Sequence, residues 1–212
     1  MSWRAATAEV AARDPALAAV IAQAGPVRLR PGDPDGPFGA LIRAIAFQQL
    51  AGGAAAAIHG RVRALIDGPL TPEAVLALPE GALRGAGLSA AKTASVRDLA
   101  AHTAAGEVDL SRTGRLPDDE IVAQLCEVRG IGPWTAQMFL LFELRRLDVW
   151  PTGDLGVRHG WGLAHGLDAP PTPSQLAALG ELLRPVRSVA AWYCWQAVHL
   201  ARNVDQGSVR TP

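Results

Sequence analysis

Two short stretches of this sequence hold residue types that can do chemistry. Gly130-Ile131-Gly132 has the pattern of a tight turn between two helices, and Asp154 stands at the start of a further helix. Such a hairpin turns peptide N–H groups outward, with the positive end of the next helix dipole behind them, which predicts a phosphate site that needs no net basic charge. Asp154 can cap its helix as a carboxylate and stabilise positive charge that develops nearby in a reaction.

Each of these features also has a plain structural explanation. A Gly-x-Gly between helices is most often an ordinary turn, and an isolated aspartate before a helix is most often only a cap. Trp134, directly after the hairpin, can be a core aromatic as easily as a pocket wall. The chemistry therefore depends on what surrounds these residues.

Helix start and stop signals predict the elements that position them. Asp14, Ser89 and Thr172 have the type and place of N-caps, and Gly52-Gly53 separates two apolar helical runs. We predict about ten helices, over residues 15–24, 38–46, 54–66, 72–78, 90–105, 134–144, 155–163, 173–183 and 188–201, with one more beginning at 118. No segment alternates cleanly with period two, so the predicted fold class is all-α. We expect the tail after Asn203 to fray.

Composition limits the class of protein. The 212 residues are 49% hydrophobic, enough for one large domain or two small lobes. Twenty basic and 20 acidic residues balance, so binding of nucleic acid would depend on local patches or backbone groups. Lys92 is the only lysine, which leaves few candidates for an amine that forms a Schiff base.

The two cysteines are too few for a four-cysteine iron–sulfur or zinc site and are unlike a secreted disulfide scaffold. The five histidines have no metal-ligand spacing. The sequence shows neither a signal peptide nor the roughly 18 apolar residues of a membrane span. We therefore expect a cytoplasmic protein with no membrane partner.

Several motifs together resemble the helix-hairpin-helix (HhH-GPD) DNA glycosylase superfamily, and most nearly its bacterial 3-methyladenine DNA glycosylase II branch. In this sequence they are Leu125 to Ala136, Gly153-Asp154, Leu41 to Ile45 with Gln48-Gln49, Gly87 to Lys92, and Arg187 to Tyr193. The resemblance covers roughly residues 38–202, in the family's order and at near-family spacing.

The resemblance implies a two-lobed glycosylase fold that acts on double-stranded DNA with damaged bases. One lobe, 37–148, contains the hairpin. The other, 1–36 plus 149–212, carries the catalytic aspartate, with the site in the cleft between them. It implies a monomer that works at the nucleoid without a cofactor. In the family, hairpin main-chain carbonyls can hold a monovalent cation, which would involve Cys126, Val128 and Ile131 here.

Asp154 falls where the family carries its catalytic aspartate. Cleavage of an N-glycosidic bond leaves positive charge on the sugar, which such a carboxylate stabilises while it orients the attacking water. An alkylated base is already cationic and leaves without an acid. Bifunctional relatives carry a lysine just after the hairpin, where this chain has Trp134, so the resemblance implies monofunctional hydrolysis that leaves an abasic site.

The resemblance also assigns the residues that handle the damaged base. An electron-poor alkylated base stacks on indole through a cation–π attraction, and the implied base pocket comprises Trp134, Gln137, Met138 and Trp195. We expect Trp150, Trp161 and Trp192 to be core or surface residues. Gln48 or Gln49 matches the wedge that fills the gap left by a flipped base. Phe47 and Ala51 depart from the family pattern beside the wedge, which leaves the base preference open.

The implied DNA-backbone contacts come from the hairpin and two arginines: Gly130, Ile131, Gly132, Thr135, Arg129 and Arg158. Arg145 and Arg146 can add positive potential, with solvated surface arginines as the alternative. Lys92 and Ser89 can touch phosphate too, although a plain helix cap is the simpler role for Ser89. Two other functions stay open: a helix-hairpin-helix DNA-binding protein without catalysis, and a glycosylase for deaminated, oxidised or mismatched bases.

Overall fold

The computed structural model describes residues 1–208, with side chains up to Asn203, and this part of the chain contains helices and no strand. The all-α prediction is confirmed. The chain divides into two compact units. We call residues 1–30 with the chain from residue 145 onward the discontinuous unit, and residues 31–144 the continuous unit. Residues 209–212, part of the tail predicted to fray, lie outside the described residues.

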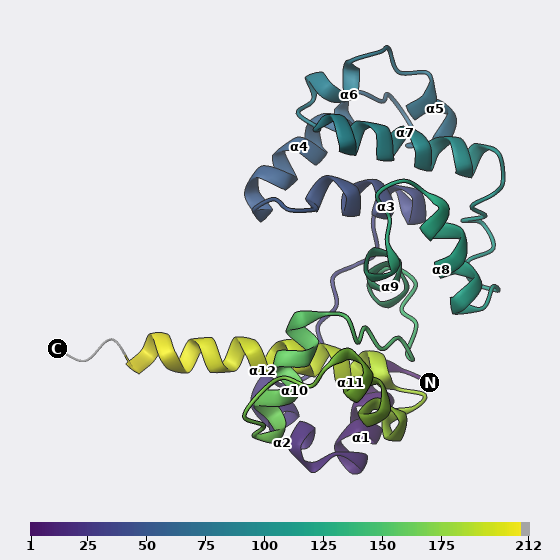
Figure 1. The fold of residues 1–212 in the computed structure, drawn as a ribbon. Helices are drawn as coiled ribbons and strands as arrows, with labels where there is room; N and C mark the ends of the chain where they lie inside the picture. The colour runs from purple at the N-terminus through teal and green to yellow at the C-terminus, as the bar shows by residue number, and fades with distance from the viewer. Residues whose placement is uncertain (209–212) are drawn as a thin grey trace. The chain divides into compact units, whose positions relative to one another are not determined.

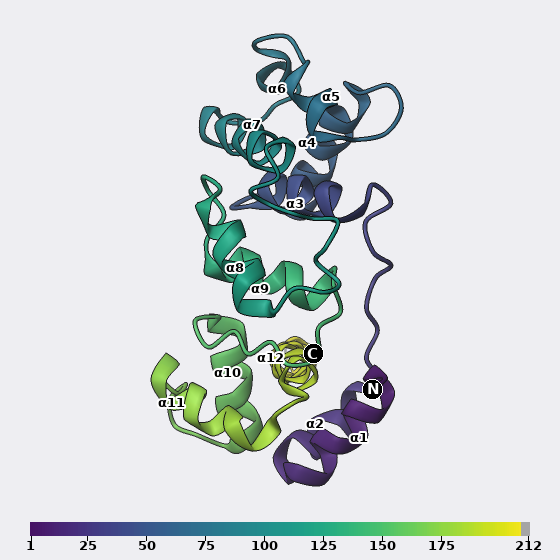
Figure 2. The same ribbon diagram turned by 90° about the vertical axis from the view of Figure 1, so that its right-hand side faces the viewer.

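The discontinuous unit is built around its last helix. It contains α1 (Trp3–Arg13), α2 (Pro15–Ala24), α10 (Leu155–His165), α11 (Pro173–Leu179), a 3-10 helix (Gly180–Leu183) and α12 (Arg187–Ser208). α12, yellow in Figure 1, packs against α10, α2 and α1. Figure 2 views α12 nearly along its axis, with α10 beside it and α1 and α2 below. The helix that joins this unit together is thus the C-terminal one.

The continuous unit contains the remaining helices: α3 (Gly36–Phe47), α4 (Gly52–Ala64), α5 (Pro72–Leu76), α6 (Ala82–Gly85), α7 (Ala90–Ala104), α8 (Asp118–Glu127) and α9 (Pro133–Phe142). α3 contacts α4, α7 and α9, so this apolar helix holds the unit together. Its core side chains include Leu41, Ile42 and Ile45, all at most 1% exposed. The helical spacing of these residues in the sequence predicted this buried face.

The predicted caps form as expected. Asp14 accepts the Leu17 N–H at 2.9 Å, and Ser89 accepts the Lys92 N–H at 3.2 Å. Thr172 forms a full capping box with Gln175. These contacts join residues only three positions apart, which is why a local pattern found them.

Some helices and helix ends differ from the prediction. α1 was missed because it is alanine-rich and buries only Ala6 and Val10, too few apolar positions for a visible stripe. The predicted helix over 173–183 is an α-helix that tightens into a 3-10 turn at Gly180, and the one over 72–78 ends at Leu76. α12 continues past Ala201 to Ser208.

Two glycines let α10 approach α12 closely. A Cβ at Gly160 would overlap the backbone of Cys194, and a Cβ at Gly156 would lie 2.8 Å from Trp195 Cδ1. Their spacing of four residues places both on one face of the helix. Because neither carries a side chain, the start of α10 lies directly against the middle of α12.

Candidate active site and nucleic-acid interface

Asp154 stands at the N-cap of α10 and is held by two donors. Its Oδ1 accepts the backbone N–H of Val157 at 2.8 Å and the indole N–H of Trp195 at 3.0 Å. Two hydrogen bonds to one oxygen, from two different helices, fix the plane of the carboxylate. The cap predicted from sequence is present, and the indole contact goes beyond what a cap requires.

Trp195 thus holds the carboxylate, a contact that its predicted place in the base pocket did not include. The indole is partly buried on α12. The hydrogen bond between Trp195 and Asp154 requires a glycine at position 156, because a Cβ there would lie 3.0 Å from both Asp154 Oδ1 and Trp195 Nε1. Sequence reasoning missed Gly156, although its spacing of four from Gly160 was a visible signal of a close helix crossing.

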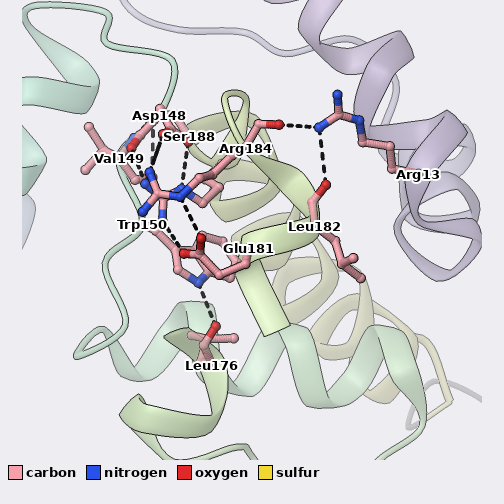
Figure 3. Close-up of polar contacts among 10 residues, drawn as sticks. Arg13, Asp148, Val149, Trp150, Leu176, Glu181, Leu182, Arg184 and Ser188 are labelled. Carbon is pink, nitrogen blue, oxygen red and sulfur yellow. Dashed lines mark hydrogen bonds and ion pairs between the residues drawn. The ribbon is translucent and has the colours of Figure 1, made fainter. Parts of the chain in front are cut away.

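The loop that leads to Asp154 is anchored on the first turn of α12. Ser188, fully buried, accepts the Val149 N–H through Oγ at 2.8 Å, and its own N–H donates to the Leu147 carbonyl at 2.9 Å. Figure 3 shows Ser188 and Val149 side by side in this network. The same helix therefore holds the loop at Ser188 and the carboxylate at Trp195.

Ion pairs reinforce this anchor at Asp148. Arg187 meets both carboxylate oxygens, Nε to Oδ1 at 2.7 Å and Nη2 to Oδ2 at 2.9 Å, and Arg184 Nη1 reaches Oδ2 at 3.0 Å. The fork of the guanidinium suits a carboxylate in this bidentate geometry. Glu181 pairs with both arginines. Figure 3 shows Glu181 beside Arg184, and the hydrogen bond from Arg184 lowers the pKa of the Glu181 carboxyl.

Three tryptophans are core residues, as expected. Trp150, Trp161 and Trp192 are at most 9% exposed. Trp150 packs edge-on against Trp161, with ring centroids 5.8 Å apart, and donates its indole N–H to the Leu176 carbonyl at 2.8 Å. Gly180 leaves room for the Trp150 ring, which a Cβ would overlap. These residues stiffen the scaffold beneath the loop.

Cys194, on α12, has a fully buried thiol. Burial, with smaller contributions from the charges of Asp14 and Asp154, raises the pKa of the Cys194 thiol. The protonated thiol is a poor nucleophile and a poor metal ligand. Cys194 is therefore a packing residue of the core.

The hairpin forms between α8 and α9 as the glycine pattern predicted. Gly130 has φ 79°, and a Cβ there would overlap Ser95 Oγ on α7. Ile131, 3% exposed, fills the space beneath the turn. Only glycine fits at position 130, for both its backbone conformation and its close approach to α7.

The peptide N–H groups of the hairpin fall into two sets. The Arg129 N–H donates to Asp98 Oδ2 at 2.7 Å, and the Ile131 N–H donates to the Val128 carbonyl at 3.0 Å. Among the described residues, the N–H groups of Gly130, Gly132 and Thr135 have no acceptor. Asp98 was missed because nothing local marks an aspartate on α7 as the partner of a residue 31 positions away.

The start of α9 also lacks a side-chain cap. Its N-cap is Gly132, which offers no oxygen, and Pro133 occupies the first helical position. A helix N-terminus with open donors attracts anions through those donors and the dipole. The predicted phosphate site therefore has the donors that it requires.

Gln48 and Gln49 differ in environment. Gln48 Nε2 donates to the Gly130 carbonyl at 2.9 Å, which ties the loop after α3 to the hairpin. Gln49 is exposed, with a left-handed φ of 55°. Lys92 Nζ donates to the carbonyls of Ala46 and Gln48 at 2.8 and 2.6 Å. Lys92, which the sequence analysis gave as a candidate phosphate contact, is thus bonded to the loop after α3.

The remaining predicted site residues divide between the two units. On α9, the Trp134 side chain is 51% exposed, the Thr135 side chain is buried, and Gln137 and Met138 are partly buried. Because Trp134 lies on the surface, its alternative interpretation as a core aromatic is wrong.

The predicted arginines also differ in their contacts. Arg129 is exposed beside the hairpin. Arg158 Nε donates to the Pro171 carbonyl at 2.6 Å, and Arg145 donates to the Arg30 carbonyl. Arg158 and Arg145 therefore each use a guanidinium N–H in a hydrogen bond within the discontinuous unit.

A comparison with protein families matches residues 42–185, more than half of the chain, to the HhH-GPD superfamily of base excision DNA repair proteins. The chain belongs to the HhH-GPD superfamily. The matched range includes the second half of α3, the hairpin, Asp154 and the loop that α12 anchors. The resemblance found in the motifs is confirmed.

Individual HhH-GPD proteins are similar over most of the chain. The DNA-3-methyladenine glycosylase 1 of Schizosaccharomyces pombe is 36% identical over 168 residues, 78% of this chain and 74% of that protein. A structure of the S. pombe 3-methyladenine DNA glycosylase with abasic DNA has a TM-score of 0.79 at 33% identity, and covers 92% of this chain and 97% of that one. A DNA-3-methyladenine glycosidase from Bacillus halodurans reaches 0.82 at 35%, covering 92% and 89%.

Among the described residues of this HhH-GPD chain, no group of three or more His, Cys, Asp or Glu side chains could hold a metal ion. Nor is any described helix long and apolar enough to cross a membrane.

Proposed function

We propose that this protein is a DNA glycosylase that flips out alkylated purines, of the 3-methyladenine and 7-methylguanine type, and hydrolyses their glycosidic bond in base excision repair. The observation that carries the proposal is the Asp154 carboxylate, fixed by Val157 and by Trp195. Relatives named as 3-methyladenine glycosylases support the substrate class.

The chemistry needs one carboxylate and one water. As the bond between C1′ and the base nitrogen breaks, its electron pair leaves with the base, and an alkylated base becomes neutral in doing so. Asp154 stabilises the positive charge left on the sugar and orients the water that attacks C1′. The surplus proton of that water passes to solvent, and an abasic site remains.

The hairpin supplies the grip on the DNA backbone. The open N–H groups of Gly130, Gly132 and Thr135 would bind a phosphate at the positive end of α9, with the Arg129 side chain adding positive charge. Arg158, in the discontinuous unit, is proposed as a separate contact with the DNA backbone. Buried Ile131 supports the turn from below. This arrangement explains how a chain with balanced charge binds DNA.

The base pocket and the wedge follow from the same proposal. The proposed base-pocket residues are Trp134, Gln137 and Met138 on α9 of the continuous unit, and Trp195 on α12 of the discontinuous unit. An exposed indole such as Trp134 suits stacking on a cationic base. Gln49 is the better wedge candidate than Gln48, because its side chain is exposed while that of Gln48 is bonded to Gly130.

The protein is proposed to be monofunctional. Strand cleavage by a glycosylase needs an amine that forms a Schiff base, and the position after the hairpin holds Trp134. The only lysine, Lys92, already donates to two main-chain carbonyls. Both observations support hydrolysis without β-elimination.

A monovalent cation fits the hairpin chemically. Cys126 lies in the last turn of α8, where helix carbonyls carry partial negative charge, and the carbonyls of Val128 and Ile131 follow within the turn. The Val128 carbonyl accepts only one N–H in the described chain, from Ile131, which leaves its second lone pair for a cation. These three carbonyls would hold the ion, and the ion would supply positive charge for a DNA phosphate.

Base release from methylated DNA tests the proposal. We expect purified protein to release 3-methyladenine and 7-methylguanine, to leave the strand intact until the abasic product is heated, and to lose release in Asp154→Asn. Unchanged release by Asp154→Asn would refute the mechanism. Direct nicking would refute monofunctional action, and release only from deaminated, oxidised or mismatched substrates would refute the substrate class.

A further inference from the structure

The loop that follows α3 is held by the single lysine of the chain. The last carbonyls of a helix have no partner within the helix and carry the negative end of its dipole. At the end of α3, Lys92 Nζ donates to the Ala46 and Gln48 carbonyls at 2.8 and 2.6 Å. Lys92 comes from the first turn of α7, so it ties two helices at the point where α3 stops.

The same loop is tied on its other side to the hairpin. Gln48 gives its backbone carbonyl to Lys92 and its side-chain amide to the Gly130 carbonyl at 2.9 Å. All four residues of this chain of contacts, Lys92, Ala46, Gln48 and Gly130, belong to the continuous unit. Lys92 and the hairpin therefore hold the loop from opposite sides of Gln48.

The next residue, Gln49, needs such support. It is exposed and has φ 55°, in the left-handed region that residues other than glycine rarely adopt. A strained conformation persists only where its surroundings hold it. Gln48, directly before Gln49, is fixed at two atoms: its backbone carbonyl oxygen, bonded to Lys92, and its side-chain Nε2, bonded to Gly130. These two contacts provide that constraint.

We propose that Lys92 is a positioning residue for base flipping, which acts by holding the Gln48-Gln49 loop in the form that enters DNA while the hairpin holds the backbone. The inference rests on the proposed function. The Lys92 ammonium carries three donors on a flexible stem, so it can bond both carbonyls of this loop at once. Partial burial at this position lowers the pKa of the Lys92 amine.

The alternative role for Lys92 is a direct phosphate contact, which has a different signature. Loss of a phosphate contact weakens binding to all DNA and lowers the salt dependence of the affinity by about one ion. Loss of a positioning residue leaves general DNA binding in place and impairs the insertion of the loop.

The experiment compares Lys92→Met and Lys92→Arg with the matched control Arg97→Met. Arg97 is also a basic residue of α7 that donates to two main-chain carbonyls, those of Leu78 and Pro79, away from the loop. The probes are an undamaged duplex, for affinity, and a duplex with 2-aminopurine beside a tetrahydrofuran abasic analogue, whose fluorescence reports insertion. Single-turnover base release is measured in parallel.

For Lys92→Met we expect undamaged-duplex affinity within about twofold of wild type, with an unchanged salt slope, since no phosphate contact is lost. We expect a smaller 2-aminopurine response and a base-release rate lower by about tenfold or more, because small misplacements near a reacting centre have large effects. Lys92→Arg should recover part of both losses, and Arg97→Met should show neither.

A normal 2-aminopurine response in Lys92→Met would overturn the proposal, as would a general loss of affinity with a reduced salt slope. If Lys92→Met does not fold, Lys92→Gln, which keeps a polar side chain without the charge, tests the same link, and we expect the same reduced insertion. A normal response there would also overturn it. Absence of base release by the wild type would refute the proposed function alone, because the fluorescence readout requires no catalysis.

Discussion

Two helix starts in this protein have the same dipole and opposite chemistry. α10 begins with Asp154, whose carboxylate accepts the Val157 N–H and so occupies the positive end of its own helix. α9 begins with Gly132 and Pro133, which provide no side-chain cap, and the N–H groups of Gly132 and Thr135 have no acceptor in the described chain. One start keeps an anion of its own, and the other is available to an anion from outside.

The supports of the two starts differ accordingly. The Asp154 side chain is itself bonded, to the Trp195 indole and the Val157 N–H, and its loop is anchored at Ser188 on α12. The hairpin before α9 is held through its backbone, by Asp98 at the Arg129 N–H and by Gln48 at the Gly130 carbonyl. A reacting group needs a fixed orientation, whereas a phosphate grip needs unoccupied donors on a firm base.

The largest expected effect comes from removing the charge at α10. Asp154→Asn should lower single-turnover base release by about 10²–10³-fold, because one preorganised electrostatic group contributes about that much. Its unfolding free energy should stay within about 0.5 kcal/mol of wild type, since asparagine caps a helix as well as aspartate. Base release and thermal unfolding together check this. Base release at the wild-type rate would mean that the residue is only a cap.

The next effect tests the backbone support of the hairpin. Gly130→Ala places a Cβ against Ser95 and requires a left-handed alanine, so we expect a destabilisation of about 1–3 kcal/mol, measured by urea unfolding. The matched control is Gly132→Ala, where a Cβ meets nothing within 4 Å. It should cost at most about 1 kcal/mol, since alanine is a poor N-cap. Equal costs would contradict the assigned role of Gly130.

A third change makes the start of α9 resemble that of α10. Gly132→Asp supplies the missing cap, so stability should rise by a few tenths of a kcal/mol. DNA affinity should fall about tenfold at low salt, because the new carboxylate occupies and repels the phosphate site. Gly132→Asn caps without charge and should bind more tightly than Gly132→Asp. Undiminished binding by Gly132→Asp, measured by fluorescence anisotropy, would place the phosphate elsewhere.

The smallest expected effect concerns the orientation of Asp154. Trp195→Phe keeps an aromatic ring but removes the donor to Oδ1, so base release should fall by roughly twofold to tenfold, the range for one net hydrogen bond. Trp134→Phe, which alters the other predicted indole, is the comparison. Kinetics with unmethylated DNA as competitor separates binding from chemistry. A rate for Trp195→Phe equal to wild type would show that the indole hydrogen bond does not position the carboxylate.

Much of the local structure was predictable from the sequence. The caps at Asp14, Ser89 and Thr172, the hairpin glycines and the N-cap at Asp154 all formed where expected. Helix α1 was not predictable, because its alanines carry no amphipathic pattern. The place of Asp154 in the site came from the resemblance, since the local pattern alone supported only a cap.

The sequence by itself determined the features that depend on residues within about four positions: helix starts, the positive-φ glycine at 130 and the absence of a cap at Gly132. Only the tertiary structure decided which distant groups meet. The Trp195 indole donates to Asp154 across 41 residues, and the Gln48 amide donates to Gly130 across 82. An indole N–H or a side-chain amide can bond to an acceptor almost anywhere in a folded chain, so helix packing decides which acceptor it meets. Here Gly156 and Gly160 let α10 pack closely against α12, which brings the Trp195 indole to Asp154.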